Sequence, residues 1–175
     1  GHRAKKIMDR GEFVPDEIMV GLIADRLDQT AHKPFILDGF PRTIPQAHGL
    51  DDLLNILYQK MDCVVVMQIA DSLIINRLSN RRSCKECNQV FNLLYDPPQQ
   101  ADKCNECNGP LFLREDDIAN TIQQRLNIYH QQTEPVIEYY AKRGMIEIID
   151  AKNSIQEIKT HIIERLSAIT TNFNS

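Results

Sequence analysis

The sequence has no apolar run close to the length of about 20 residues that a membrane-spanning helix requires. Its first residues also lack the apolar stretch of a signal peptide. Basic residues are not in excess, and the net charge of −4 argues against a generally basic surface for nucleic acid or lipid headgroups, although it leaves room for a local basic cleft. These absences predict a cytoplasmic protein with no membrane partner and no nucleic-acid partner.

The chain alternates between segments of helical periodicity and short apolar runs, and its hydrophobic content of 42% suffices for one substantial core. Helices are predicted over 15–29, 45–57, 73–78 and 118–129 and after the capping-box pair Ser154 and Glu157, and buried strands over 35–37, 63–69 and 145–149. Strands that alternate with helices indicate an α/β fold with a parallel sheet. Periodicity is absent from 83–113, which predicts an inserted irregular module.

Four of the five cysteines lie in this module as two Cys-x-x-Cys pairs, Cys84 with Cys87 and Cys104 with Cys107, separated by 16 residues. This spacing is typical of two knuckles that close a tetrahedral zinc site. Because protein ligands fill all four positions, the metal is predicted to be structural and to hold together a loop too small for a core of its own. Catalytic zinc, a redox pair, and iron bound by the same thiolates are the alternatives.

Arginines surround the cysteine module. Arg77 and Arg81 lie four residues apart on the approach to it and share a helix face, while Arg114 and Arg125 flank the return path. Four guanidinium groups near one loop suit a polyanionic ligand. A solvated charged face is the ordinary explanation of any single arginine, and Arg77 taken alone would be assigned to one.

The run from Asp38 to Arg42, Asp-Gly-Phe-Pro-Arg, follows the predicted strand 35–37 at the carboxyl end, where α/β proteins build ligand sites. Glycine there permits close approach of a ligand to the backbone, whereas the aspartate could equally cap the next turn. The longer run through Thr43, Pro45 and Gln46 is more specific than Asp-Gly alone.

Together with the segments Ile7 to Glu17 and Arg114 to Asp117, the run Leu37 to Thr43 and the four cysteines make nearly the whole chain resemble the zinc-lid adenylate kinases. The resemblance implies a P-loop kinase-like parallel sheet flanked by helices, an AMP-binding insertion, and a zinc-binding lid that closes over ATP. It also implies reversible phosphoryl transfer from MgATP to AMP, giving two ADP. The expected ligands are therefore ATP, AMP and ADP, with zinc in the lid and magnesium arriving with ATP, and the expected state is a monomer.

The same resemblance implies roles for individual residues. Those that match the AMP site are Glu12, Phe13, Val14, Gly39, Phe40, Pro41, Arg42, Gln46, Arg114 and Arg125. Those that match the ATP site are Arg77, Arg81, Val90, Phe91 and Asn153. Catalysis is assigned to Arg42, Arg77, Arg81, Arg114, Arg125 and Asp38, the last as a carboxylate near magnesium. Arginine suits these positions because its planar fork binds phosphate oxygens bidentately, and phosphoryl transfer needs positioning and positive charge rather than a nucleophile.

The implied boundaries are 1–25 for the remainder of the AMP-binding insertion, 26–80 and 115–175 for the core, and 81–114 for the lid. The family's phosphate loop, Gly-x-x-x-x-Gly-Lys, does not occur in the sequence, and its first strand and helix are also missing. We therefore expect a fold that is incomplete at its N-terminus, with an exposed apolar slot and weak or no activity from these 175 residues by themselves. Such a chain could also swap segments or associate.

Two other functions fit parts of the sequence. A zinc-ribbon module that binds a protein or nucleic acid without catalysis would explain the cysteines, but not the run from Asp38 to Gln46 or the pair Arg114 and Arg125. A kinase for another nucleoside monophosphate, with UMP or GMP as acceptor, is the second alternative. Gln46 and the lid cysteines favour AMP over these acceptors.

Overall fold

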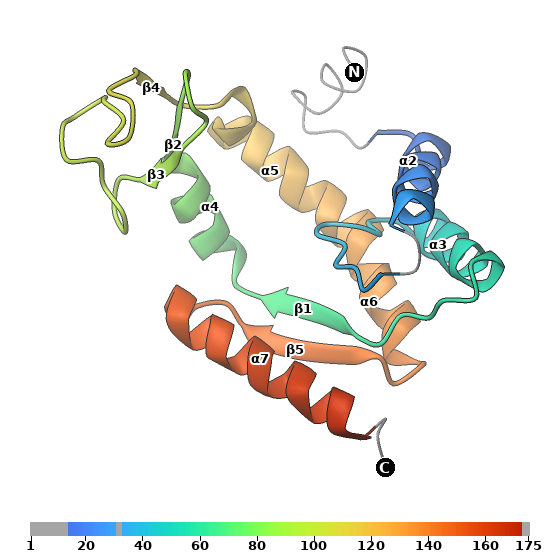
Figure 1. The fold of residues 1–175 in the computed structure, drawn as a ribbon. Coiled ribbons are helices and arrows are strands. Elements are labelled where there is room, and N and C mark those ends of the chain that lie inside the picture. Colours follow the sequence, from blue (N-terminus) through green and yellow to red (C-terminus); the bar gives the residue numbers. More distant parts are fainter. Residues whose placement is uncertain (1–13, 31–32, 173–175) are drawn as a thin grey trace. The chain divides into compact units, whose positions relative to one another are not determined.

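The computed structural model describes residues 14–30 and 33–172 (Figure 1). The chain divides into two units, which are described separately below. One comprises Ala70–Ile128 together with Gly1–Val14, and the other comprises Pro15–Ile69 together with Tyr129–Ser175. Among the described helices, none combines the length and the apolar character that crossing a membrane would need.

A parallel strand pair forms the centre of the second unit. Strand β1 (Val64–Gln68) pairs with β5 (Ile146–Asp150), in a register that runs from Val64 opposite Ile146 to Gln68 opposite Asp150. Helices α6 (Glu134–Ala141) and α7 (Ile155–Asn172) both contact β5, and Figure 1 shows α7 running alongside it. This parallel sheet flanked by helices confirms the predicted α/β class.

Two further helices of this unit pack on each other. Helix α2 (Asp16–Gln29) and helix α3 (Ile44–Ile56) follow the predicted boundaries to within a residue or two. Leu27 of α2 is buried with Leu50 and Leu54 of α3, so the apolar faces seen in the sequence do meet. Thr43 is the N-cap of α3, and its hydroxyl oxygen accepts a hydrogen bond from the Gln46 backbone N–H at 3.2 Å.

The predicted strand at 35–37 is wrong for the described part of the chain. These residues are extended but belong to no sheet, and the Ile36 side chain is 91% exposed. A strand needs a neighbour to satisfy its backbone groups, and β1 pairs with β5 alone among the described residues. The expected burial of the strands is also incomplete, because Met67 and Ile148 are exposed.

The capping box before α7 is confirmed. The Ser154 backbone N–H and hydroxyl both donate to Glu157 Oε2, at 2.8 and 2.6 Å, and the Glu157 backbone N–H donates to the Ser154 hydroxyl oxygen at 3.3 Å. These bonds lower the pKa of Glu157, chiefly through the Ser154 hydroxyl, because they stabilise the carboxylate. A π-helical turn at Tyr129–Thr133 precedes α6.

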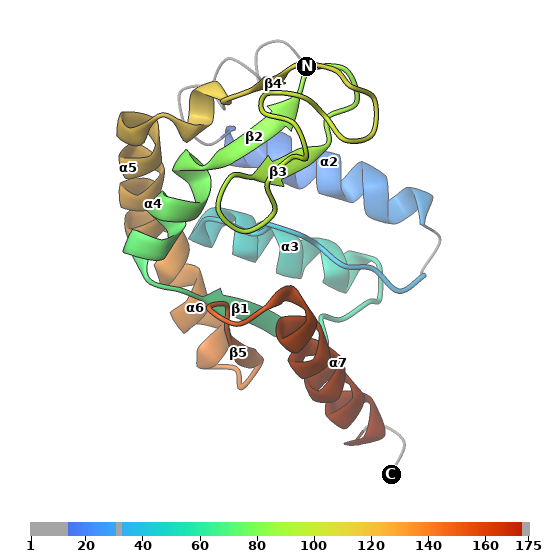
Figure 2. The same ribbon diagram turned by 90° about the vertical axis from the view of Figure 1, so that its left-hand side faces the viewer.

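Two helices and a small antiparallel sheet make up the described part of the first unit, residues 70–128 and Val14. Helix α4 (Asp71–Ser79) contacts α5 (Ala119–Ile128), and both views show them side by side (Figures 1 and 2). Between them come β2 (Arg81–Cys84), β3 (Val90–Asn92), β4 (Leu111–Phe112) and a 3-10 turn at Glu115–Asp117. The strand order is β3-β2-β4. The module predicted to be irregular therefore has a short sheet, too brief for periodicity to reveal.

Candidate functional site

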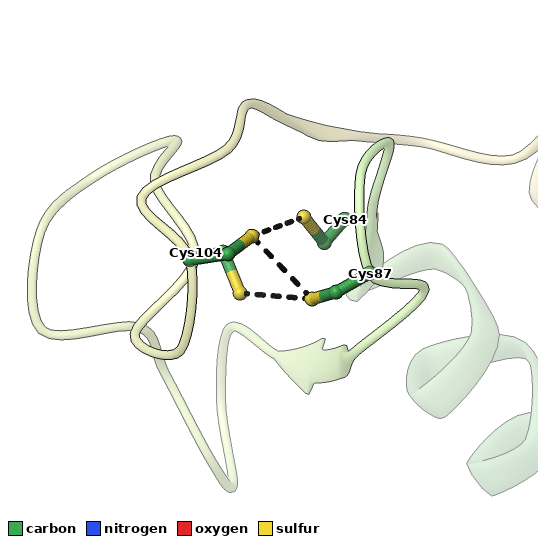
Figure 3. A group of neighbouring side chains, drawn as sticks. Cys84, Cys87 and Cys104 are labelled. Atoms are coloured by element: carbon green, nitrogen blue, oxygen red, sulfur yellow. Dashed lines mark hydrogen bonds between the residues drawn. The ribbon is translucent and has the colours of Figure 1, made fainter.

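The four cysteines of the first unit converge on one point. Their Sγ atoms all lie within 4.8 Å of one another, and Figure 3 shows Cys84 and Cys87 pointing from one loop toward Cys104 on another. The Sγ atoms of Cys84 and Cys107 are 3.4 Å apart, and that of Cys87 is 3.5 Å from those of both Cys104 and Cys107. A tetrahedral centre with Zn–S bonds of about 2.3 Å places its sulfurs about 3.8 Å apart. The group can therefore hold a metal ion after small adjustments.

The two cysteine pairs sit in matching backbone turns. The Asn88 backbone N–H donates to the carbonyl of Cys84 at 3.1 Å, and the Asn108 N–H donates to that of Cys104 at 3.0 Å. Both asparagines have positive φ, 61° and 58°, a conformation that asparagine tolerates better than most residues. The first cysteine of each pair is buried and the second is exposed. The repeated turn aims all four sulfurs at a common centre.

The electrostatics of the cluster favour a cation. Backbone N–H groups of Cys87 and Glu86 donate to the Cys84 sulfur and lower its pKa to about 7. The N–H of Gly109 lowers the pKa of Cys107, but the thiols of Cys84 and Cys87 outweigh it and raise that pKa to about 12. Neighbouring sulfurs thus disfavour a thiolate at Cys107 while Cys84 is deprotonated. A divalent cation would offset this repulsion.

Gly109 leaves the space that the cluster needs. A Cβ atom at this position would lie 2.6 Å from the Glu86 side chain and 3.1 Å from Cys84 Sγ. We expect Gly109→Ala to weaken metal retention about tenfold, as changes beside metal ligands commonly do, measured by competition with a coloured chelator. Gly21→Ala is the matched control, because its Cβ would meet no atom within 4 Å. Equal chelator resistance of the two variants would contradict the steric argument.

Three of the predicted arginines meet on two neighbouring aspartates, all within the first unit. Arg81 is the first residue of β2, so the prediction that it shares a helix face with Arg77 of α4 is wrong. Its Nε and Nη2 donate to Asp117, with both distances 2.7 Å. Arg114 donates from Nε and Nη2 to Asp116 at 2.8 and 3.1 Å. Arg125 of α5 donates from Nη1 to the Asp116 backbone oxygen at 2.9 Å and to its carboxylate at 3.2 Å. We call these five residues the Arg–Asp cluster.

The cluster is arranged to hold the arginines in place while leaving them accessible. The Asp117 side chain has no exposed surface, whereas those of Arg81, Arg114 and Arg125 are partly exposed. Three positive and two negative charges leave a surplus of one positive charge. Because aspartate supplies the orienting bonds, the guanidinium groups are positioned before a ligand arrives. The sequence alone indicates no role for Asp116 and Asp117.

The other residues predicted for the ATP site lie apart from these contacts. The Arg77 guanidinium lies over the Tyr95 ring at 6.0 Å, and the Arg77 carbonyl accepts from Asn92 at 3.0 Å. Phe91 is 4% exposed and packs in a small core with two of the cysteines, while the neighbouring Val90 is exposed. Their predicted contacts with ATP stay predictions. Asn153 follows β5 in the second unit and is exposed. Its predicted contact with ATP also stays a prediction.

The predicted AMP-site run lies in the second unit. Gly39 has a φ of 69°, and its carbonyl accepts from Arg42 Nε at 2.7 Å, which folds the arginine back over the turn. The peptide bond between Phe40 and Pro41 is cis. Asp38 is exposed, and Gln46 is buried in the first turn of α3.

Val14 is buried at the start of the described chain, whereas Glu12 and Phe13 lie outside the described residues.

Fold and site define a class of protein. It is an α/β protein with parallel strands, and its inserted loop carries four cysteines able to hold a metal ion, in the same unit as a preorganised group of arginines. A family model described as adenylate kinase matches residues 1–145.

Curated proteins named adenylate kinase are similar over nearly the whole chain. The one from Archaeoglobus fulgidus is 42% identical over 159 residues, which cover 90% of this chain and 73% of that protein. The one from Methanocella arvoryzae is 43% identical, over 93% of this chain and 76% of that protein. The one from Methanothrix thermoacetophila is 44% identical, over 95% of this chain and 78% of that protein. The chain belongs to the adenylate kinase family.

Proposed function

We propose that this protein catalyses reversible phosphoryl transfer from MgATP to AMP, giving two ADP. The observation that carries the proposal is the Arg–Asp cluster, which gathers three guanidinium groups in a chain of the adenylate kinase family. Transfer of a phosphoryl group requires little covalent chemistry from the protein. It requires fixed positive charge around the transferred phosphoryl group. Arginines held by buried or half-buried aspartates supply this charge, and their guanidinium groups need not reorient when the reaction occurs.

The remaining site residues take the roles that the resemblance implies. Gly39, Phe40, Pro41, Arg42 and Gln46 hold the phosphate and base of AMP, with Val14 and the residues before it. Arg81 and Arg77 contact ATP, and Arg114 and Arg125 bridge both nucleotides. Asp38 lies near the magnesium ion that accompanies ATP as part of the substrate. Lid residues are those of 81–114.

The metal of the cysteine cluster is proposed to be zinc in a structural role. Four sulfur ligands complete a tetrahedral shell and leave no position for a substrate or water. The ion would fix the two cysteine turns relative to each other, in a sheet too small to be stable alone. Four thiols without disulfides also suit a reducing compartment, which supports a cytoplasmic location.

Acceptor choice tests the proposed function. The complete protein is expected to convert AMP with MgATP at least about tenfold more efficiently than GMP or UMP, measured as kcat/KM for each acceptor. Preference for GMP or UMP would assign the protein to another class of nucleoside monophosphate kinase. Binding without turnover of any acceptor would favour a non-catalytic zinc module.

A further inference from the structure

A carboxylate on α2 reaches two residues of α3 in the second unit. Asp16 Oδ1 accepts from the Thr43 hydroxyl at 3.0 Å and from Gln46 Nε2 at 2.8 Å. Gln46 is 2% exposed and Thr43 is also buried, so these bonds lie largely outside water. Asp16 itself is half-buried, in the first turn of its helix. Asp16 and Gln46 are 30 positions apart, so no local sequence pattern predicts the bond between them.

These bonds fix the orientation of the Gln46 side-chain amide. A carboxylate can only accept, so the amide nitrogen must face Asp16. On its other side, Gln46 Oε1 accepts from the Arg42 backbone N–H at 2.8 Å, which can only donate. Rotating the amide by half a turn would place the Gln46 oxygen against the Asp16 carboxylate and the Gln46 NH₂ group against the Arg42 backbone N–H. Both neighbours therefore impose the same orientation.

Thr43 is oriented by the same carboxylate. Its hydroxyl hydrogen goes to Asp16, which leaves the oxygen lone pairs to accept from the Gln46 backbone N–H at 3.2 Å. The first turn of α3 is thereby tied to α2. Packing of Leu27 against Leu50 and Leu54 holds the two helices together along the same interface.

The fixed amide presents a defined hydrogen-bonding pattern. A glutamine amide has two N–H donors and two acceptor lone pairs, and the bonds to Asp16 and Arg42 use one of each. One N–H donor and one acceptor lone pair of the amide remain. At its Watson–Crick edge, adenine offers the complement, an amino group that donates next to a ring nitrogen that accepts, whereas guanine offers the reverse there, a carbonyl that accepts next to a ring N–H that donates.

We propose that Asp16 is a positioning residue that sets the base selectivity of the nucleoside monophosphate site by locking the Gln46 amide in one orientation. The inference rests on the proposed function, because it takes Gln46 to be the residue that meets the base. Asp16 itself touches no substrate. Its role is to make the wrong hydrogen-bonding pattern costly, and this discriminates against guanine more than it strengthens binding of adenine.

Asp16→Asn tests the proposal with almost no change in shape. Asparagine offers both an oxygen and an NH₂ group, so either orientation of Gln46 becomes acceptable. The affinity ratio of AMP to GMP, measured by calorimetric titration of the complete protein, is expected to fall about tenfold. KM for AMP should rise while KM for MgATP stays unchanged. Asp25→Asn, an exposed charge change on the same helix, should leave all of these values at those of the wild type.

Each outcome bears on a distinct claim. An unchanged AMP-to-GMP ratio in Asp16→Asn, with the wild type preferring AMP, would overturn the role of Asp16 and leave the proposed function intact. A wild type that prefers GMP or binds neither nucleotide would overturn both. Should Asp16→Asn fail to fold, Asp16→Ser carries the same expected loss, because a hydroxyl can also donate or accept. Asp16→Glu keeps an acceptor-only group and should retain most of the selectivity.

Discussion

Arg81→Ala in the complete protein is expected to lower kcat by about 10³-fold. The Arg81 guanidinium is held by two bonds to Asp117 and so offers its charge to the transferring phosphoryl group without reorganising. Arg81→Lys should recover only part of the loss, since lysine keeps the charge but not the planar fork. Steady-state rates at saturating MgATP and AMP measure both effects.

Arg82→Ala is the matched control for this prediction. It removes the same charge one position along β2, but Arg82 donates to the backbone oxygens of Ser79 and Arg81 instead of the aspartates. Its turnover should be close to normal. Because Arg81→Ala also leaves the buried Asp117 poorly paired, the double variant Arg81→Ala, Asp117→Asn should recover thermal stability without recovering turnover. Near-normal turnover of Arg81→Ala would remove Arg81 from the mechanism.

Cys84→Ser is expected to abolish stoichiometric metal binding and to lower the melting temperature by about 5–10 °C. Cys84 is buried at the centre of the cysteine cluster and packs with Phe91 and Cys104, so losing the metal also loosens this small core. Wild-type protein stripped with a chelator should melt at the same temperature as the variant. Elemental analysis and thermal unfolding provide the two measurements.

Cys63→Ser is the control for the cysteine prediction. Cys63 lies outside the cluster, and burial raises the pKa of its thiol, so it is suited neither to metal binding nor to reaction. Its metal content should stay at one ion per chain. An unchanged melting curve in Cys84→Ser, with zinc still bound, would contradict the structural role of the metal.

Local signals explain which elements could be predicted from the sequence. Helices α2 and α3 follow from apolar spacing and from a proline at the N-terminal end of each helix. The cap of α7 follows from Ser154 and Glu157, because this interaction joins residues three apart. The cysteine site could be predicted for the same reason, since each pair forms within a single turn. The predicted strand at 35–37 is absent from the sheets, because a strand forms only beside a neighbouring strand, which the residues of 35–37 do not themselves specify.

The site contacts that the sequence does not predict join residues far apart along the chain. Asp117 meets Arg81 across 36 positions, and Asp16 meets Gln46 across 30. In the sequence, each aspartate resembles an ordinary surface charge at the start of a helix. Acidic residues are common there because they cap the helix and interact favourably with its dipole. Only tertiary packing shows that their partners are residues predicted to bind nucleotide.

Product stoichiometry tests the central claim most directly. Phosphorus NMR of the complete protein with MgATP and AMP is expected to show two ADP formed for each ATP and AMP consumed, with no inorganic phosphate. Release of phosphate with AMP unchanged, or no reaction from folded and metal-loaded protein, would contradict the proposal that the Arg–Asp cluster serves phosphoryl transfer between nucleotides.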